Sequence, residues 1–157
     1  MTTSLMTPAP AAVGTVLDEN EVQRLVRHWL QTRDQGRPAQ EVLQCLAEDG
    51  LVVHFPHLTL RGRREFGDWY TRTKQLFPRE RHEVEQADVR LTSPLHAEVT
   101  LTLRWQMWGP HSTQGWIGAD TTQHWSVVLR DGTARLRTLA VDHTHLLANS
   151  APLDRIS

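Results

Sequence analysis

His54 has the side chain best suited to acid-base chemistry in this sequence. It lies near the end of a predicted short strand, Leu51 to Phe55, directly before Pro56. An imidazole changes charge near neutral pH, so it abstracts a proton readily when it lines a pocket. The alternative is a hydrogen-bonded histidine at a pocket rim or in the core. We predict His54 as a general base.

His82 and Asp142 are the other two predicted catalytic residues. His82 opens a predicted strand and shares the alternation of Val84, so its ring is expected to point inward as a second acid-base group or substrate anchor. Asp142 ends the last predicted strand with the alternation of Ala140. An inward carboxylate there would orient a histidine or act as the base. The alternative for Asp142 is a turn or capping role.

Large aromatic side chains supply candidate ligand contacts, because the chain has six tryptophans. Rings between helices and sheet can grip a flat polycyclic or aromatic ligand, although core packing explains them equally well. Arg104 lies among polar residues of a long predicted strand. It belongs either to a polar sheet face or to a pocket mouth, where it would stabilise an enolate. The predicted substrate-binding residues are Trp69, Tyr70, Arg104, Trp105 and Trp125.

The histidine spacings do not predict a metal site. Pairs occur at His54-x-x-His57 and His143-x-His145, and the second spacing puts both rings on one face of a strand. No nearby acid or cysteine completes a ligand set. Glycine-rich phosphate loops and a nucleophile elbow are also missing from the sequence, so no cofactor is predicted.

Composition excludes two classes of partner. The formal net charge of -1 supplies no field that would attract nucleic acid or an anionic membrane. No apolar run approaches the roughly 20 residues that cross a bilayer, and the N-terminus lacks the basic start of a secretory signal. We therefore expect a cytoplasmic protein that binds neither nucleic acid nor membrane. Its single cysteine, Cys45, falls in a helical apolar pattern and suits the core.

Three helices are predicted in the first half of the chain. Asp18 caps the first helix and Gly36 ends it. A second, shorter helix follows Pro38 and stops at Asp49-Gly50. A third runs from Arg63 to Phe77. The buried stripe of the first helix follows the spacing i, i+3, i+4, i+7 and i+8, with Val22, Leu25, Val26, Trp29 and Leu30.

The remaining sequence alternates as β-strands. Two short strands, Leu51 to Phe55 and Leu58 to Arg61, form a hairpin, and longer strands follow in an antiparallel meander. Asp131-Gly132 predicts a two-residue turn in the last hairpin. We expect one domain over residues 17–147, an N-terminal arm over 1–16 and a C-terminal tail over 148–157. The longer strands are His82 to Leu91, Ala97 to Trp108, Thr121 to Leu129 and Ala134 to Val141.

This order of elements resembles the nuclear-transport-factor-2-like superfamily. The stretch AEDGLVVHFPHLTLRGRREFGDWY is similar to the SnoaL-like signature, with an acidic-Gly pair before a strand, a Pro turn and a Gly that opens the third helix. The stretch QHWSVVLRDGTARLRTLAVD is similar to the last hairpin of that family. The resemblance covers about Leu17 to Leu147. It implies an α+β cone, with three N-terminal helices packed on a curved, mostly antiparallel sheet.

The superfamily includes polyketide cyclases, ketosteroid isomerase, scytalone dehydratase, limonene epoxide hydrolase and non-catalytic binders, so the fold alone assigns no reaction. Ketosteroid isomerase carries its aspartate base where this chain has His54. Limonene epoxide hydrolase has a central Arg-x-Asp, which here reads Arg104-Trp105-Gln106. Scytalone dehydratase uses paired tyrosines, whereas this chain has only Tyr70. SnoaL-type cyclases pair a pocket acid with a histidine, and this sequence supplies both.

Two functions stay open at this level. The first is a cofactor-independent enzyme that cyclises, isomerises or dehydrates a carbonyl-containing, polyketide- or steroid-like substrate, with His54 as base, His82 as partner and Asp142 as orienting acid. The second is a non-catalytic ligand-binding or assembly module with the same fold. In either case the expected ligand is small and hydrophobic or aromatic. A homodimer is expected through the outer sheet face, which carries Trp108.

Overall fold

The computed structural model describes residues 16–110 and 115–156, so most of the predicted N-terminal arm lies outside the described residues. The elements follow the predicted order. They are α1 (Glu19–Asp34), α2 (Ala39–Leu43), β1 (Val52–Phe55), β2 (Leu58–Arg61), α3 (Gly62–Leu76), β3 (Arg79–Ser93), β4 (His96–Trp108), β5 (Trp116–Arg130), β6 (Thr133–Leu146) and the 3-10 helix η3 (Leu153–Ile156).

Helix α1 begins and ends at the residues that the sequence predicts. The Asp18 side chain accepts a hydrogen bond from the Glu21 amide at 2.8 Å, which satisfies one of the free N–H groups of the first turn. Gly36 follows the helix with φ +66°, a conformation that glycine adopts without strain. The buried stripe continues to the last turn, where Arg33 is also buried.

Helix α2 is shorter than predicted. It ends at Leu43, and the chain then pairs with the edge of β6 instead of continuing as a helix. The Ala47 amide donates to the Leu136 carbonyl at 2.7 Å, and the Leu136 amide donates to the Cys45 carbonyl at 2.8 Å. These bonds satisfy the β6 edge beyond β1, so tertiary pairing outweighs the helical pattern here.

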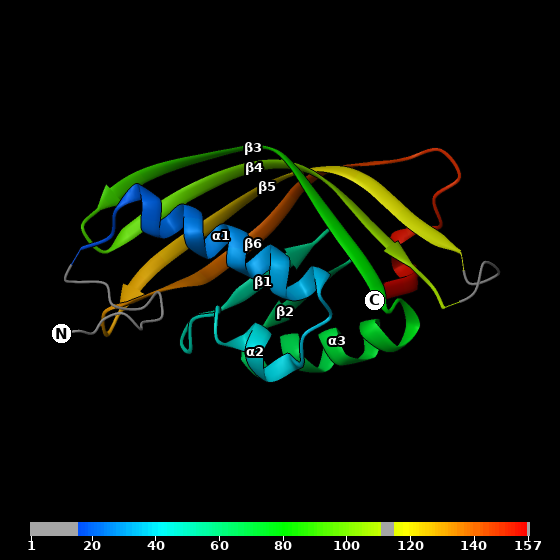
Figure 1. Ribbon diagram of the computed structural model, residues 1–157, viewed down its shortest axis with the longest axis horizontal. Coiled ribbons are helices and arrows are strands. Elements are labelled where there is room, and N and C mark those ends of the chain that lie inside the picture. The colour runs from blue at the N-terminus through cyan, green and yellow to red at the C-terminus, as the bar shows by residue number, and fades with distance from the viewer. Residues whose placement is uncertain (1–15, 111–114, 157) are drawn as a thin grey trace.

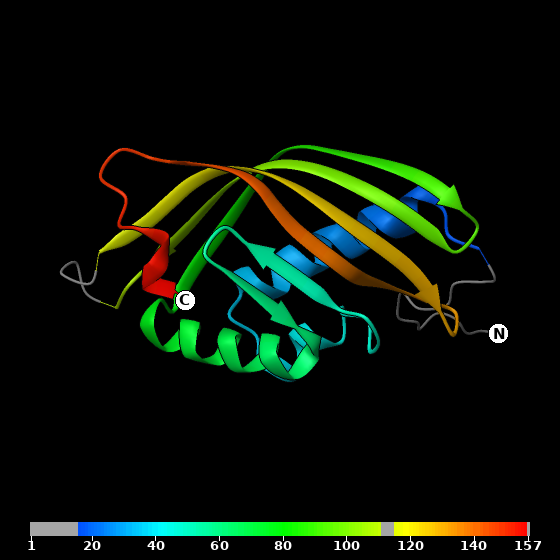
Figure 2. The ribbon, with the colours of Figure 1, turned by 180° about the vertical axis from the view of Figure 1, so that it is seen from behind.

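The six strands form one sheet in the order β2-β1-β6-β5-β4-β3. All neighbours are antiparallel except β1 and β6, which are parallel. The predicted meander is therefore correct for the four long strands, and the small hairpin joins it through one parallel pair. Figures 1 and 2 show the sheet strongly curved, with α1 across its concave side and α3 beyond β1 and β2. The predicted α+β fold class is confirmed.

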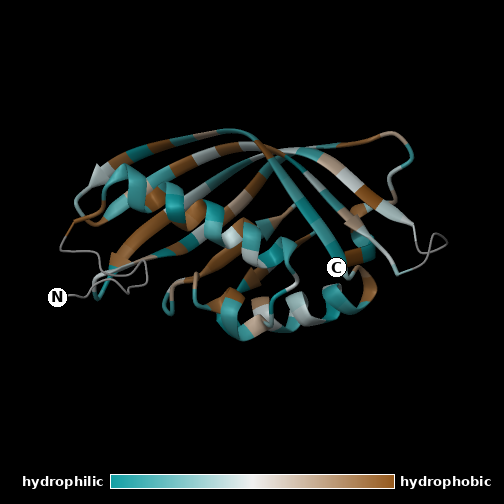
Figure 3. Cartoon of the chain, viewed as in Figure 1, coloured by the Kyte–Doolittle hydropathy of each residue, from teal (hydrophilic) through white to brown (hydrophobic). Residues whose placement is uncertain are grey.

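Alternation along β4 separates the two faces of the sheet. The odd-numbered side chains from Ala97 to Met107 are buried, while the even-numbered side chains between them are half-buried or exposed. Figure 3 shows this alternation as brown and teal bands along the long strands. The inner face therefore meets the helices, and the outer face carries the polar residues.

The β3–β4 and β5–β6 pairs contain four register shifts, and two of them lie near predicted catalytic residues. One of these two lies between Val84 and Gln86 on β3, and the other gives β6 an extra residue, Asp142, opposite Thr122 and Gln123. A bulge leaves its extra residue unpaired and reverses the alternation after it. In contrast, the β5–β6 turn follows prediction, because Asp131 and Gly132 have φ values of 51° and 75°, as a tight two-residue hairpin requires.

Candidate functional site

His82 and Asp34 form a partly buried pair where the end of α1 meets β3. The His82 Nδ1 atom lies 2.6 Å from the Asp34 Oδ1 atom, and the His82 amide donates to the Asp34 Oδ2 atom at 3.0 Å. The histidine side chain is 3% exposed. Because an ionised carboxylate only accepts hydrogen bonds, Nδ1 carries a proton, and Nε2 presents a lone pair whenever the ring is neutral. The pair thus presents a fixed, basic nitrogen.

A third charged group, Glu80, lies beside that nitrogen. Its Oε2 atom is 3.7 Å from His82 Nε2 and accepts from Arg33 Nη2 and Trp105 Nε1, both at 2.6 Å. Its Oε1 atom accepts from Lys74 Nζ at 2.9 Å. Burial alone raises the pKa of this carboxyl, but the charges of Arg33, His82 and Lys74 outweigh burial and hold the pKa at about 2. Glu80 is therefore a permanent buried anion at neutral pH.

Arg33 is the cation closest to Glu80, and its side chain is only 5% exposed. Its guanidinium carbon lies 5.4 Å from the ring centre of Trp29 and 6.0 Å from that of Trp69. Its Nε atom is buried and has no hydrogen-bond partner among the described residues, and the same is true of Trp29 Nε1. The interior thus holds a cation between two indole rings with an unused N–H donor.

Aromatic rings fill the interior beside the His82–Asp34 pair. His82 and Trp105 stack with their ring centres 6.3 Å apart, Trp105 and Phe55 follow at 6.0 Å, and Phe55 and His57 at 5.8 Å. Trp69 lies 4.8 Å from Phe55. These near-parallel rings pack against one another and help to shield the His82 ring from solvent.

The 3-10 helix η3 covers one side of this aromatic interior. Ile156 is 2% exposed, and its carbonyl accepts a hydrogen bond from Trp69 Nε1 at 2.6 Å. Burial lowers the pKa of His57, with the Ile156 backbone and the Asp154 carboxylate opposing the shift. The C-terminal residues thus pack against the rings.

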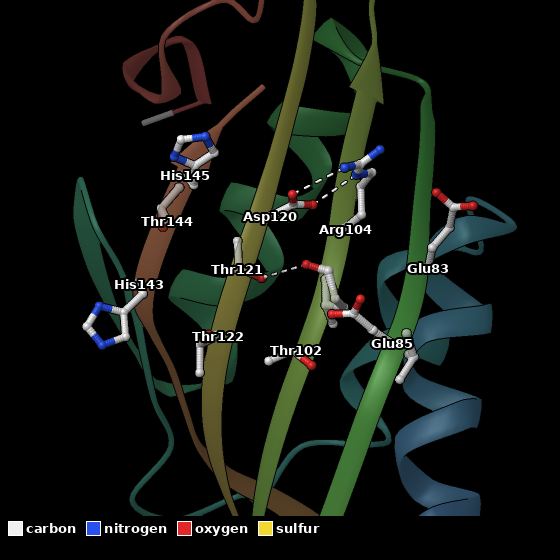
Figure 4. Close-up of a pocket in the computed structure, with 12 residues that line it drawn as sticks. Glu83, Glu85, Thr102, Arg104, Asp120, Thr121, Thr122, His143, Thr144 and His145 are labelled. Carbon is white, nitrogen blue, oxygen red and sulfur yellow. Dashed lines mark hydrogen bonds and ion pairs between the residues drawn. The ribbon is translucent and has the colours of Figure 1, made fainter. Parts of the chain in front are cut away.

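The largest described cavity, about 620 Å³, lies elsewhere, across β3 to β6 (Figure 4). Arg104 donates to both carboxylate oxygens of Asp120 there, at 2.8 and 3.2 Å. That hydrogen bond raises the pKa of Arg104 and lowers the pKa of Asp120. Both side chains are about half exposed, so solvent screens the pair. Smaller cavities of about 460 and 100 Å³ also lie away from His82, which lines none of the three.

The predicted catalytic trio is not brought together. His82 points inward, as expected, but His54 is exposed and its Nδ1 atom contacts Thr59 Oγ1 at 3.2 Å on the neighbouring strand. Strand alternation explains this, because Val53 and Phe55 take the two inward positions. Asp142 is the bulge residue of β6, is exposed, and contacts the His124 ring. The expected inward direction of Asp142 is therefore corrected, and the His54 ring is exposed instead of shielded.

The predicted substrate-binding residues also divide between the two faces. Trp69, Trp105 and Trp125 are buried inside, and Trp125 Nε1 donates to the Gln123 side chain at 2.9 Å. Tyr70 is buried, its hydroxyl donates to the Arg37 carbonyl at 2.7 Å, and burial raises its pKa to about 12. Arg104, in contrast, lies in the outer cavity, which agrees with the polar-face alternative.

Sequence reasoning missed Arg33, Asp34 and Glu80. The signal was present, because continuing the stripe of Trp29 and Leu30 by one helical turn reaches Arg33 and Asp34. Glu80 precedes His82 by two residues, the spacing that shares a strand face. Within the described ranges, no group of three or more His, Cys, Asp or Glu side chains has the arrangement of a metal site.

The comparisons with known proteins identify the family. A model of the SnoaL-like domain matches residues 14–140, so the chain belongs to this family. Its structure has the NTF2-like fold. No curated protein matches the sequence. No helix in the described part of the chain has the length and apolar character needed to span a membrane.

Solved structures share the fold at low sequence identity. A proposed aromatic ring hydroxylase from Novosphingobium aromaticivorans is 12% identical over 87% of this chain and 94% of its own, with a TM-score of 0.74. A proposed scytalone dehydratase from the same species is 15% identical over 84% and 90%, with a TM-score of 0.68. Hexachlorocyclohexane dehydrochlorinase LinA-type3 from Novosphingobium barchaimii LL02 is 13% identical over 84% and 91%, with a TM-score of 0.67.

Proposed function

We propose that this chain is an acid-base enzyme whose base is His82 Nε2, acting on a hydrophobic, carbonyl-containing substrate. The observation that carries the proposal is the His82–Asp34 pair, which holds a buried imidazole ring beside stacked aromatic rings. A base that is fixed and shielded from water removes a proton from carbon more readily than one in solvent. The proposal moves the general base from His54, the residue chosen from sequence, to His82.

The chemistry follows from the two nitrogens of the ring. Nε2 takes a proton from the carbon next to the carbonyl, and the electrons of the broken C–H bond pass to the carbonyl oxygen as an enolate. The enolate then reforms the carbonyl and expels a β-hydroxyl group, which takes the proton from Nε2 and leaves as water. Asp34 accepts from Nδ1–H throughout and stabilises the imidazolium. Reprotonation at another carbon would give isomerisation instead.

Two of the structural neighbours support elimination over the other reactions. One is named a scytalone dehydratase and another a dehydrochlorinase, and both names describe loss of a small molecule from carbon. Their identity to this chain is 15% or less, so the support is for a reaction class and not for a substrate.

Exchange of carbon-bound hydrogen tests the base directly, without knowledge of the natural substrate. The flat aromatic ketone 2-tetralone is incubated with the protein in D₂O, and loss of its α-hydrogens is followed by NMR. We expect His82→Gln to slow protein-catalysed exchange by about 10²-fold or more. Asp34→Asn should also slow exchange, because an amide no longer fixes the required tautomer.

His124→Gln is the matched control, since His124 also contacts an aspartate but is exposed on the outer face. It should exchange at the wild-type rate. His54→Gln compares the sequence-based prediction with the present proposal. If exchange slows in the His54→Gln variant but keeps the wild-type rate in folded His82→Gln protein, the assignment of His82 as the base is overturned. Urea unfolding midpoints establish that each variant is folded.

A non-catalytic ligand-binding module is the second candidate, and one observation favours it. The largest described cavity lies on the outer face, while the three described cavities all exclude His82. A binder of this kind would leave the exchange of 2-tetralone at the buffer rate. Its ligand would shift NMR signals of Thr102 and Thr122 in the outer cavity instead of those of Trp105.

A further inference from the structure

We infer that the guanidinium of Arg33 is the binding site for an anionic oxygen of the ligand, held between the rings of Trp29 and Trp69. The inference rests on the proposed function, because it assigns the ligand oxygen that becomes negative when His82 takes the proton. It also names a ligand class: flat, largely apolar molecules that carry an enolate, phenolate or carboxylate oxygen.

The first support is the unused donor. Arg33 Nη2 is engaged with Glu80, but Arg33 Nε is buried without a partner in the described structure, on a side chain that is 5% exposed. Trp29 Nε1 is a second buried donor without an acceptor, four residues earlier on the same helix face. Buried N–H groups are destabilising when unpaired, so both favour a ligand that supplies acceptor oxygens.

The second support is the position of Arg33 relative to the base. The same Glu80 oxygen lies 2.6 Å from Arg33 Nη2 and 3.7 Å from His82 Nε2. The proton acceptor and the cation therefore contact the same carboxylate oxygen, so one ligand could place a C–H bond near His82 and its neighbouring carbonyl oxygen near Arg33. Charge that develops on that oxygen would meet a fixed, desolvated cation.

The third support is the balance of charge. Glu80 and Asp34 offset Arg33 and Lys74, so the buried cluster with neutral His82 has no net charge. Proton transfer from carbon to His82 creates one positive and one negative charge. Asp34 and Glu80 face the new imidazolium, which leaves Arg33 for the new oxyanion. The indole faces of Trp29 and Trp69 keep water away from it.

The test uses 4-nitrophenol, whose phenolate imitates an enolate and absorbs visible light only when ionised. Dissociation constants for the phenol and phenolate forms are measured by tryptophan fluorescence on either side of its ionisation, and absorbance reports the bound form. Wild-type protein should bind phenolate about tenfold or more tightly than phenol, because hydrogen bonds to a charged partner are the stronger ones. Equal affinity for both forms, or binding of neither, would overturn the inference.

Variants of Arg33 test whether this residue causes the preference for phenolate over phenol. Arg33→Gln should abolish the preference. Arg33→Lys should retain part of it, because lysine keeps the positive charge but lacks the planar guanidinium. Arg33→Gln combined with Glu80→Gln removes both charges together and protects the fold if the single variant unfolds. Arg27→Gln, on the exposed side of the same helix, should bind as wild type does. A phenolate preference that survives in folded Arg33→Gln/Glu80→Gln protein would overturn the assignment.

His82→Gln separates this inference from the proposed function. In this variant 2-tetralone exchange should fall while the phenolate preference persists, because Arg33 and not the imidazole binds the oxygen. Unchanged exchange together with a preference that depends on Arg33 would refute the catalytic proposal and leave the oxyanion site standing. A preference that disappears in His82→Gln and persists in Arg33→Gln would refute the oxyanion site.

Discussion

The ionisable residues fall into two groups: those that hydrogen-bond to each other in the interior and those that lie exposed on the outer face of the sheet. Glu80 belongs to the first group, since its two oxygens accept from Arg33, Lys74 and Trp105. A buried carboxylate of this kind costs free energy to desolvate, and its partners must repay that cost through good geometry. Its role is positioning, because it fixes the groups around His82 instead of reacting itself.

The lowered pKa of Glu80 predicts a specific acid sensitivity. The pKa falls from 4.5 to about 2 on folding, so this group stabilises the protein above about pH 5, and that stability is lost as the pH falls toward 2. We expect Glu80→Gln to flatten the dependence of unfolding free energy on pH across this range. At pH 7 the variant should lose about 3 kcal/mol, because two buried cations lose their partner.

Urea unfolding at a series of pH values measures both effects. Asp68→Asn serves as the control, since Asp68 is also acidic but is exposed on α3. It should retain the wild-type slope. A Glu80→Gln protein whose stability falls with acid as steeply as the wild type would contradict the prediction.

At the scale of elements, the site is made where α1, β3 and the chain end meet. The last turn of α1 supplies Arg33 and Asp34, and the start of β3 supplies Glu80 and His82. The helix η3 then packs Ile156 against Trp69. The aromatic interior is therefore covered by η3 in this structure.

Replacing Ile156 by alanine should weaken this cover. We expect a loss of about 2 kcal/mol or more, because a buried isoleucine leaves a cavity. Quenching of tryptophan fluorescence by acrylamide should increase at the same time, since η3, whose Ile156 carbonyl binds Trp69, loses its buried anchor. Leu153→Ala is the control on the same 3-10 helix, where the side chain is only partly buried. Unchanged quenching in a destabilised Ile156→Ala protein would show that η3 does not shield the rings.

At the scale of the whole molecule, the outer sheet face has the pattern of a self-complementary surface. Glu83 and Glu85 lie on the β3 side of the hollow, and His143 and His145 lie on the β6 side (Figure 4). In a two-fold dimer each patch meets its counterpart, so acids of one copy would face histidines of the other. We propose that two copies associate through this face.

A charge at the centre of the hollow tests that association. Thr102 lies between the two edges, so in a two-fold dimer it would lie near its own copy. We expect wild-type protein to scatter light as a species of twice the monomer mass, and Thr102→Glu to scatter as a monomer through like-charge repulsion. Gln40→Glu, on exposed α2, should remain dimeric. A monomeric wild type at micromolar concentration would refute the dimer.

The sequence by itself determined the fold class, the order of the elements and the bounds of α1 and α3, whereas β3 and β5 begin three and five residues before the predicted strands and β6 ends five residues after. Period-3.6 and period-2 patterns, the Asp18 cap and the Asp131-Gly132 turn depend on local chemistry, so they could be interpreted without knowledge of distant residues. The same local reasoning placed His82 inward, because its strand alternates regularly up to the first bulge. Helix α2 was predicted too long because its end depends on pairing with Leu136.

Only the tertiary structure decided which ionisable groups meet. Asp34 and His82 are separated by 48 positions in the chain, and no local pattern joins them. Asp142 lies on the face of Ala140, which pairs with exposed His124, and His54 lies between the inward-facing Val53 and Phe55. Both side chains therefore point outward, because the face that each position takes is set by the neighbouring strands and not by the strand itself. Buried charges such as Arg33 and Glu80 are stable only beside each other. Their role follows from packing, which the linear sequence does not specify.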